Sequence, residues 1–191
     1  MSNYLIAQYR TLHTQNVYGA SSLRRAPYIL PHVKSLKAKT VLDYGCGQSA
    51  LYEKIEKLGT QVTRYDPAIP SLSKKPGGKF DLVINIDVME HLPEDEIDGF
   101  IADIASYSSN ALFIIDTIPA KTILPDGQNA HLTVRPPSWW QARLKKYFPH
   151  VEPFYVRPQW RAAFRTWPYS PFERAILKLH SMKYRLQKRL T

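Results

Sequence analysis

Apolar residues recur with two different periods along this chain, and the two periods alternate. Nearly continuous apolar runs cover 80–86 and 111–115, and shorter ones begin at 40 and 61. Such runs are typical of strands in a parallel sheet, because these strands are buried on both faces. Around them, apolar residues recur at helical spacing. The expected helices lie within 3–14, 23–36, 51–58, 97–105, 136–148 and 172–191.

Serines and prolines set the expected bounds of two helices. Ser21 or Ser22 suits the N-cap of the helix within 23–36, and Ser138 suits the N-cap of the helix that follows the double proline. Pro27 and Pro31 fall inside the first of these helices, where a proline breaks or kinks the backbone.

The order of the elements predicts the fold class. The link over 67–79 is too short to hold a crossover helix and another strand, so the region of the third strand is shortened. Residues 151–157 and 160–167 alternate in polarity around a proline, which predicts an antiparallel hairpin. We therefore expect an α/β fold with a doubly wound, mostly parallel sheet and an antiparallel C-terminal hairpin.

Length and composition indicate one domain. We expect a single domain over 1–191, with N-terminal helices or a lid over 1–38, a core over 39–168 and a basic amphipathic helix over 172–191. Cys46 is the single cysteine and the six histidines are scattered, so no disulfide and no metal site are expected. There is no apolar run of transmembrane length and no leader pattern, which favours a cytoplasmic location.

The net charge of +10 is unevenly distributed. The last twenty residues hold six Lys or Arg and one Glu, so they carry half of that charge. A basic segment of this kind suits nucleic acid or the surface of an anionic membrane. The simpler interpretation of 172–191 is a helix that docks by its apolar face, and both interpretations remain open.

A glycine-spaced turn follows the first strand. Gly45 and Gly47 let the backbone bend sharply and approach a ligand closely, and the helix after them directs its free N–H groups toward that ligand. Taken alone, the turn also matches the G-x-G-x-x-A dinucleotide pattern, with Asp66 placed 19 residues after Gly47. Asp43 weighs against a dinucleotide, since an acid before the glycines would repel a pyrophosphate and favour a cationic ligand.

Three motifs in order resemble those of the class I S-adenosylmethionine-dependent methyltransferases. Val41-Leu-Asp-Tyr-Gly-Cys-Gly47 resembles the first motif of that family, and Tyr65-Asp66 its second acidic position. The stretch from Phe80 to Leu92 resembles the fourth-strand motif of the small-molecule branch, including a Glu-His pair. The resemblance covers roughly residues 35–167. It implies a Rossmann-like domain that binds S-adenosyl-L-methionine and transfers its methyl group without a metal.

The resemblance also implies roles for individual residues. Asp43 would stabilise the methionine end of the cofactor, directly or through water, and Asp66 would accept hydrogen bonds from both ribose hydroxyls. Ser49 replaces the third glycine of the family's turn, and the shortened third strand leaves the adenine pocket undefined. The cofactor-binding residues expected on this basis are Asp43, Gly45, Cys46, Gly47, Asp66, Pro67, Asp87 and Val88.

Candidates for the acceptor side lie at strand ends and in the long loop over 118–136. His91, His131 and Asp116 are expected to act in proton transfer, because ligands of doubly wound sheets bind where the strands end and loops there carry function. Tyr18 and Arg135 are expected to contact substrate.

The acceptor itself is only coarsely predicted. The chain has Asn85-Ile-Asp-Val where methyltransferases acting on nucleic-acid amino groups carry an Asn/Asp-Pro-Pro-Tyr/Phe motif, which favours transfer to O or N of a metabolite, sugar or glycan precursor. Methylation of RNA or another anionic polymer through the basic C-terminal region is the second interpretation. A cofactor-binding or partner protein without catalysis is the third, and a dehydrogenase the fourth.

Overall fold

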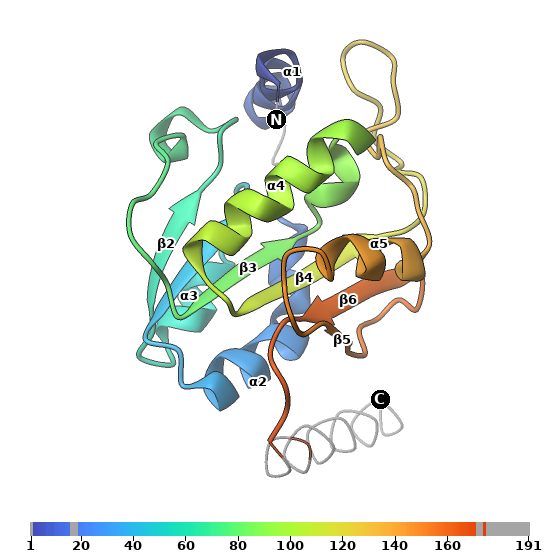
Figure 1. Ribbon diagram of the computed structural model, residues 1–191. Helices are drawn as coiled ribbons and strands as arrows, with labels where there is room; N and C mark the ends of the chain where they lie inside the picture. The colour runs from blue at the N-terminus through green and yellow to red at the C-terminus, as the bar shows by residue number, and fades with distance from the viewer. Residues whose placement is uncertain (1, 16–18, 171–173, 175–191) are drawn as a thin grey trace, which may run out of the picture.

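The computed structural model describes residues 2–15, 19–170 and 174, and it contains one six-stranded sheet with helices on both faces (Figure 1). The strands are β1 (Thr40–Tyr44), β2 (Gln61–Tyr65), β3 (Leu82–Ile86), β4 (Ala111–Asp116), β5 (Glu152–Pro153) and β6 (Arg161–Arg165). The α-helices are α1 (Asn3–Gln15), α2 (Ala26–Leu36), α3 (Leu51–Glu56), α4 (Glu94–Tyr107) and α5 (Pro137–Leu144). Three short 3-10 helices are η1 (Ser21–Arg25), η2 (Pro70–Leu72) and η3 (Met89–His91).

The sheet confirms the predicted topology. Its strand order is β2-β1-β3-β4-β6-β5, with β1 to β4 parallel and β6 antiparallel to β4. The short link between β2 and β3 holds only η2, so β2 is an edge strand within the described part of the chain. This is the shortened third-strand region that the sequence predicts.

Alternation along the strands builds two cores. Successive side chains of a strand point to opposite faces, and accordingly Leu42 and Val83 pack with α4 and α5 on one face. Val41 and Leu82 pack with α2 and α3 on the other face. The two faces are visible in Figure 1, where α4 crosses the sheet on the side opposite α2 and α3.

The predicted serine caps are wrong. The N-cap of α2 is Arg25 and that of α5 is Pro136, and neither makes a side-chain cap hydrogen bond. Ser138 lies inside the first turn of α5. The predicted break near the prolines is confirmed only in part, since η1 ends just before Pro27, whereas α2 continues through Pro31. Proline is tolerated in the first turn of a helix because its missing N–H has no partner there.

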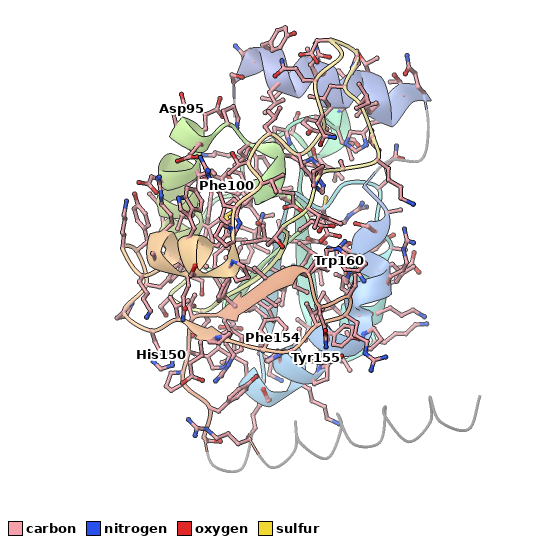
Figure 2. All side chains as sticks on the ribbon, turned by 90° about the vertical axis from the view of Figure 1, so that its right-hand side faces the viewer. Asp95, Phe100, His150, Phe154, Tyr155 and Trp160 are labelled. Carbon is pink, nitrogen blue, oxygen red and sulfur yellow. The ribbon has the colours of Figure 1, made fainter. Side chains whose placement is uncertain are left out.

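The C-terminal hairpin is confirmed in place but is shorter than expected. Glu152 pairs with Arg165 and Pro153 with Phe164, and β5 contains no further residues. The residues after β5 instead pack beside α2, where Phe154 lies against His32 and Tyr155 against Tyr28 (Figure 2).

Two predictions fall on residues that, apart from Arg174, the structure does not describe: the basic helix over 172–191 and the contact of Tyr18 with substrate. Among the helices of the described ranges, none has the length and apolar character needed to cross a membrane.

Candidate active site

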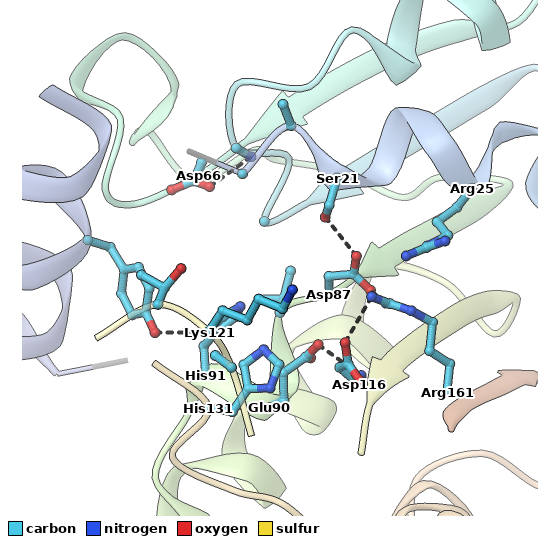
Figure 3. Close-up of a pocket in the computed structure, with 18 of the residues that line it drawn as sticks. Ser21, Arg25, Asp66, Asp87, Glu90, His91, Asp116, Lys121, His131 and Arg161 are labelled. Atoms are coloured by element: carbon cyan, nitrogen blue, oxygen red, sulfur yellow. Dashed lines mark hydrogen bonds and ion pairs between the residues drawn. The ribbon is translucent and has the colours of Figure 1, made fainter. Parts of the chain in front are cut away.

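A cavity of about 620 Å³ opens at the carboxyl end of the parallel strands (Figure 3). Each of the four parallel strands ends at its wall: Gly45 follows β1, Asp66 follows β2, Asp87 follows β3 and Asp116 is the last residue of β4. Doubly wound sheets bind their ligands at this edge. Most of the residues proposed from the sequence for cofactor and acceptor line this one cavity, and their roles stay predictions.

Two neighbours hold the glycine turn. Gly45 and Gly47 both have positive φ, at 83° and 53°. A Cβ at Gly45 would lie 2.6 Å from the Val88 side chain, and one at Gly47 would lie 2.5 Å from the Gly19 carbonyl oxygen. Glycine is therefore required at both positions by conformation and by close packing. The turn is fixed between η3 and the segment that leads into η1.

Asp66 joins the turn to the loop after β2. Its Oδ2 accepts a hydrogen bond of 2.9 Å from the Gly47 N–H, and its Oδ1 accepts one of 2.9 Å from the Ala68 N–H. A carboxylate oxygen has a second lone pair for a further donor. Asp66 thus organises the backbone around it and can still accept from hydroxyl groups in the cavity, which Pro67 and Ala68 also line.

Asp43 lies beneath the turn and, like Cys46, is not part of the cavity wall. Its side chain is 1% exposed, and within the described residues its Oδ2 has no hydrogen-bond partner. Burial raises the pKa of Asp43 to about 7, although Arg64 nearby acts in the opposite direction. A buried carboxylate oxygen without a donor is costly, and a cationic group above it would reduce that cost.

A chain of polar contacts crosses the other end of the cavity. Arg161 at the start of β6 forms ion pairs with Asp87 and Asp116, the second at 2.8 Å (Figure 3). Ser21 Oγ of η1 donates a hydrogen bond of 2.7 Å to Asp87 Oδ2. These contacts join the N-terminal segment, two strand ends and the hairpin. The sequence analysis missed Arg161, because only the register that sets it opposite Asp116 reveals its place.

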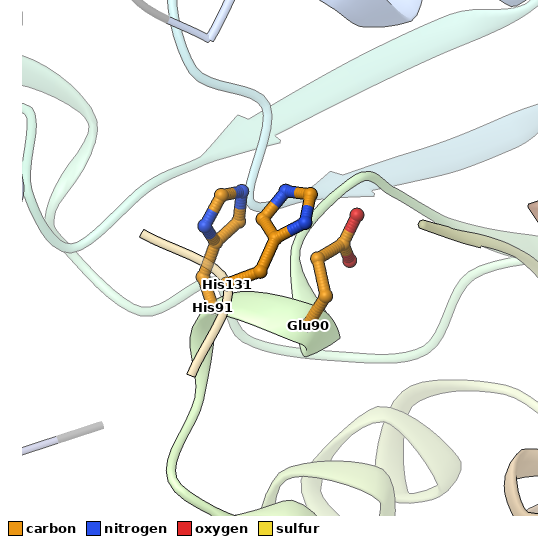
Figure 4. Close-up of side chains that lie close together, drawn as sticks. All are labelled: Glu90, His91 and His131. Atoms are coloured by element: carbon orange, nitrogen blue, oxygen red, sulfur yellow. The ribbon is translucent and has the colours of Figure 1, made fainter. Parts of the chain in front are cut away.

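Glu90, His91 and His131 form a compact cluster on the floor of the cavity (Figure 4). One ligand-type atom from each lies within 4.8 Å of the others. Glu90 is fully buried, and its Oε1 accepts a hydrogen bond of 2.9 Å from the Asp116 N–H. Burial, with Asp87 nearby, raises the pKa of Glu90 well above its ordinary value. The three residue types also suit a metal ion, and the expectation of no metal stays a prediction.

Backbone carbonyls orient both histidine rings. His131 Nδ1 lies 2.6 Å from the Ile118 carbonyl oxygen, and His91 Nδ1 lies 2.8 Å from the carbonyl oxygen of Ala130. Because a carbonyl only accepts, the ring proton of neutral His131 is on Nδ1 and its Nε2 carries a lone pair. Burial lowers the pKa of His91 to about 4, with a further contribution from His131. His91 is therefore neutral across the physiological range.

Three cations complete the cavity wall: Arg24 and Arg25 of η1, and Lys121 in the loop between β4 and α5. Arg135 is placed differently. It does not line the cavity, and its guanidinium bonds Glu94 at 2.6 and 2.9 Å. Arg24, Arg25 and Lys121 were not among the candidates predicted from the sequence, since none of them belongs to a recognisable motif.

The sequence of this chain matches a known protein family. A family profile described as "Methyltransferase domain" matches residues 14–184. A ubiquinone biosynthesis O-methyltransferase from Nitrosococcus oceani is 29% identical over a match that covers 36% of this chain and 39% of that protein. The chain thus matches less than half the length of that relative.

Solved structures share the fold at low sequence identity. A 1,6-didemethyltoxoflavin-N1-methyltransferase from Burkholderia thailandensis, with bound 1,6-didemethyltoxoflavin and S-adenosylhomocysteine, has a TM-score of 0.61 at 15% identity. The match covers 88% of this chain and 91% of that one. The DhpI-SAM-HEP complex has a TM-score of 0.64 at 17% identity and covers 88% of this chain and 100% of that one. At these identities the likeness concerns the fold.

Proposed function

The chain belongs to the methyltransferase-domain family, and on that premise we propose that it transfers the methyl group of S-adenosyl-L-methionine to an oxygen or nitrogen atom of a small polar acceptor. One observation carries the proposal. The glycine turn and Asp66 line one end of a cavity, with Asp43 buried behind the turn, and the other end is lined by polar side chains suited to an acceptor.

The residues at the first end fit the cofactor. Asp43 offers a buried carboxylate oxygen that has no hydrogen-bond partner in the described structure, which suits the positive charge of a sulfonium or an α-ammonium group. Asp66 offers acceptor capacity for a pair of ribose hydroxyls. Gly45, Gly47 and Val88 line the same cavity as Asp66. When bound, S-adenosyl-L-methionine supplies a methyl group made electrophilic by its positively charged sulfur.

His131 is the residue that we assign to proton removal. Its Nδ1 is directed to the Ile118 carbonyl, so Nε2 is the basic atom of the ring, and His131 lines the cavity. As the acceptor attacks, its proton passes to Nε2. Asp116 and Asp87 hold the neighbouring wall in place through Arg161 rather than accepting the proton. The proposed reaction needs alignment, exclusion of water and a base, and no metal.

Calorimetry followed by a turnover assay tests this function. We expect S-adenosyl-L-methionine and S-adenosylhomocysteine to bind with one site per chain, and NADH not to bind. Incubation with pooled polar metabolites, sugars and short RNA, followed by mass spectrometry, should then reveal a product heavier by one methylene in the small-molecule pool. Methylation confined to RNA would favour the polymer interpretation. Binding without any product would favour a protein that has lost catalysis.

A further inference from the structure

The acceptor end of the cavity is lined by cations from separate segments of the chain. Arg24 and Arg25 belong to η1, whereas Lys121 belongs to the loop after β4. Arg25 and Lys121 both extend toward the region around Asp87 in Figure 3. Residues nearly one hundred positions apart in the sequence thus bring positive charge to one place.

The carboxylates of this end offset those cations only in part. Asp87 and Asp116 share the guanidinium of Arg161, with all three side chains largely buried. Even with Glu90 counted as ionised, the three carboxylates of this end are outnumbered by its four cations. Among the ion pairs of the described residues, none includes Arg24, Arg25 or Lys121. With Arg161 counted against the two aspartates, the acceptor end keeps a surplus of positive charge.

Arg25 is the most informative of these cations because its side chain is half-buried. Its Nη1 donates a hydrogen bond of 3.1 Å to the Arg157 carbonyl oxygen, while its Nε is buried and has no hydrogen-bond partner in the described structure. Burial lowers the pKa of Arg25 and the adjacent Arg161 lowers it further, while Asp87 and Asp116 offset only part of this. Among the residues described, the buried Nε of this guanidinium still lacks an acceptor, which is costly beside a second guanidinium. An anion at this place would offset that cost.

We propose that the methyl acceptor carries an anionic group of the phosphate or carboxylate type, and that Arg25 holds it together with Arg24 and Lys121. The inference rests on the proposed methyl transfer and adds the substrate class. A guanidinium matches both anions with paired N–H donors, and Lys121 adds a point charge from the opposite wall. Asp66 lies at the cofactor end of the cavity, where its negative charge would repel the anionic group of the acceptor.

Calorimetry on the full chain saturated with S-adenosylhomocysteine tests the proposal. Inorganic phosphate and acetate are the two probes, titrated separately at low ionic strength. We expect at least one of them to bind, and its affinity to fall by about tenfold or more in Arg25→Gln, because a charge-assisted hydrogen bond is lost. Binding of phosphate alone would assign a phosphate-type group, and binding of acetate alone a carboxylate.

Matched variants separate this inference from general charge effects and from failure of the parent function. Lys145→Gln removes one exposed cation that does not line the cavity, and it should leave the affinity for the probe unchanged. Arg25→Lys keeps the charge but loses the paired donors, and it should give an intermediate affinity. If the wild-type chain did not bind S-adenosylhomocysteine, the proposed function itself would be refuted. Two other results would overturn only the proposal of an anionic acceptor. In the first, S-adenosylhomocysteine binds but neither phosphate nor acetate does. In the second, the wild type and Arg25→Gln bind the probe with equal affinity.

Discussion

Asp116 and Arg161 face each other across the antiparallel pairing of β4 with β6, and their charged groups meet at 2.8 Å. The last residue of one strand is thus fixed by the first residue of another. Since Arg161 also pairs with Asp87 at the end of β3, one guanidinium holds two strand ends in position. This part of the acceptor end is therefore held by the sheet itself, whereas η1 and the loop with Lys121 supply the rest of the wall.

Replacement of Arg161 should lower the free energy of unfolding. Arg161→Met leaves Asp87 and Asp116 buried without their cation, and we expect the free energy of unfolding to fall by about 3–5 kcal/mol. Arg161→Lys retains a charge and should recover part of the loss. Denaturant unfolding of the three proteins measures both effects, and an unchanged midpoint in Arg161→Met would contradict the assigned pairing.

Asp66→Ala is expected to weaken S-adenosyl-L-methionine binding by about ten- to a hundredfold, since it removes the acceptor for the ribose hydroxyls and the support of two backbone N–H groups. Calorimetry measures the change. Asp95→Ala, which removes an exposed carboxylate that does not line the cavity, is the control and should bind normally. Equal affinity in Asp66→Ala would refute its role at the cofactor.

Gly47→Ala should destabilise the protein by about 2–4 kcal/mol, because the new Cβ meets the Gly19 carbonyl and the backbone is left-handed. Gly59→Ala is the matched control, since Gly59 also has a positive φ but nothing lies within 4 Å of its added Cβ. We expect a loss of about 1–2 kcal/mol there, from conformation alone. Thermal unfolding compares the two, and equal losses would show that the packing against Gly19 is unimportant.

Ionisation of Asp43 should lower the free energy of unfolding but raise the affinity for S-adenosyl-L-methionine. Its pKa is about 7 in the folded chain and ordinarily 3.8, so between pH 4 and 7 the folded state binds more protons than the unfolded state. The contribution of Asp43 to the free energy of unfolding therefore falls as pH rises through this range, by at most about 1.4 kcal/mol per pH unit. Affinity for S-adenosyl-L-methionine should instead rise toward and above pH 7, as the carboxylate forms. Both trends should be absent in Asp43→Asn, as measured by unfolding and calorimetry at a series of pH values.

Chelation tests the expectation of metal independence. Treatment with EDTA followed by gel filtration should leave turnover unchanged, because the proposed reaction uses His131 as a base. If turnover were lost and then restored by a divalent cation, the cluster of Glu90, His91 and His131 would have to be reinterpreted as a metal site.

The sequence predicted the features that depend on local pattern. The apolar run at 80–86 predicted a central strand, and the short link after Asp66 predicted the shortened region between β2 and β3. The strand-end positions of Asp87 and Asp116 followed from the same pattern, because the carboxyl ends of parallel strands share an edge.

The features that depend on register and packing were out of reach. Arg161 became a partner of Asp116 only through the antiparallel pairing, which no local signal specifies. Ser21 looked like a helix cap, but tertiary contact with Asp87 decided its role. Arg135 looked like a substrate ligand in a long loop, whereas the structure pairs it with Glu94.

The contact between Arg161 and the strand ends also bears on synthesis at the ribosome. Asp87 and Asp116 emerge from the exit tunnel before their shared cation does, so a nascent chain that stops short of β6 carries two carboxylates that cannot yet be buried together. The four parallel strands can pair earlier, because their partners are already present. Arrival of the hairpin is therefore the step that closes the acceptor end, and stalled chains of increasing length should become protease-resistant there only once residue 161 has left the tunnel.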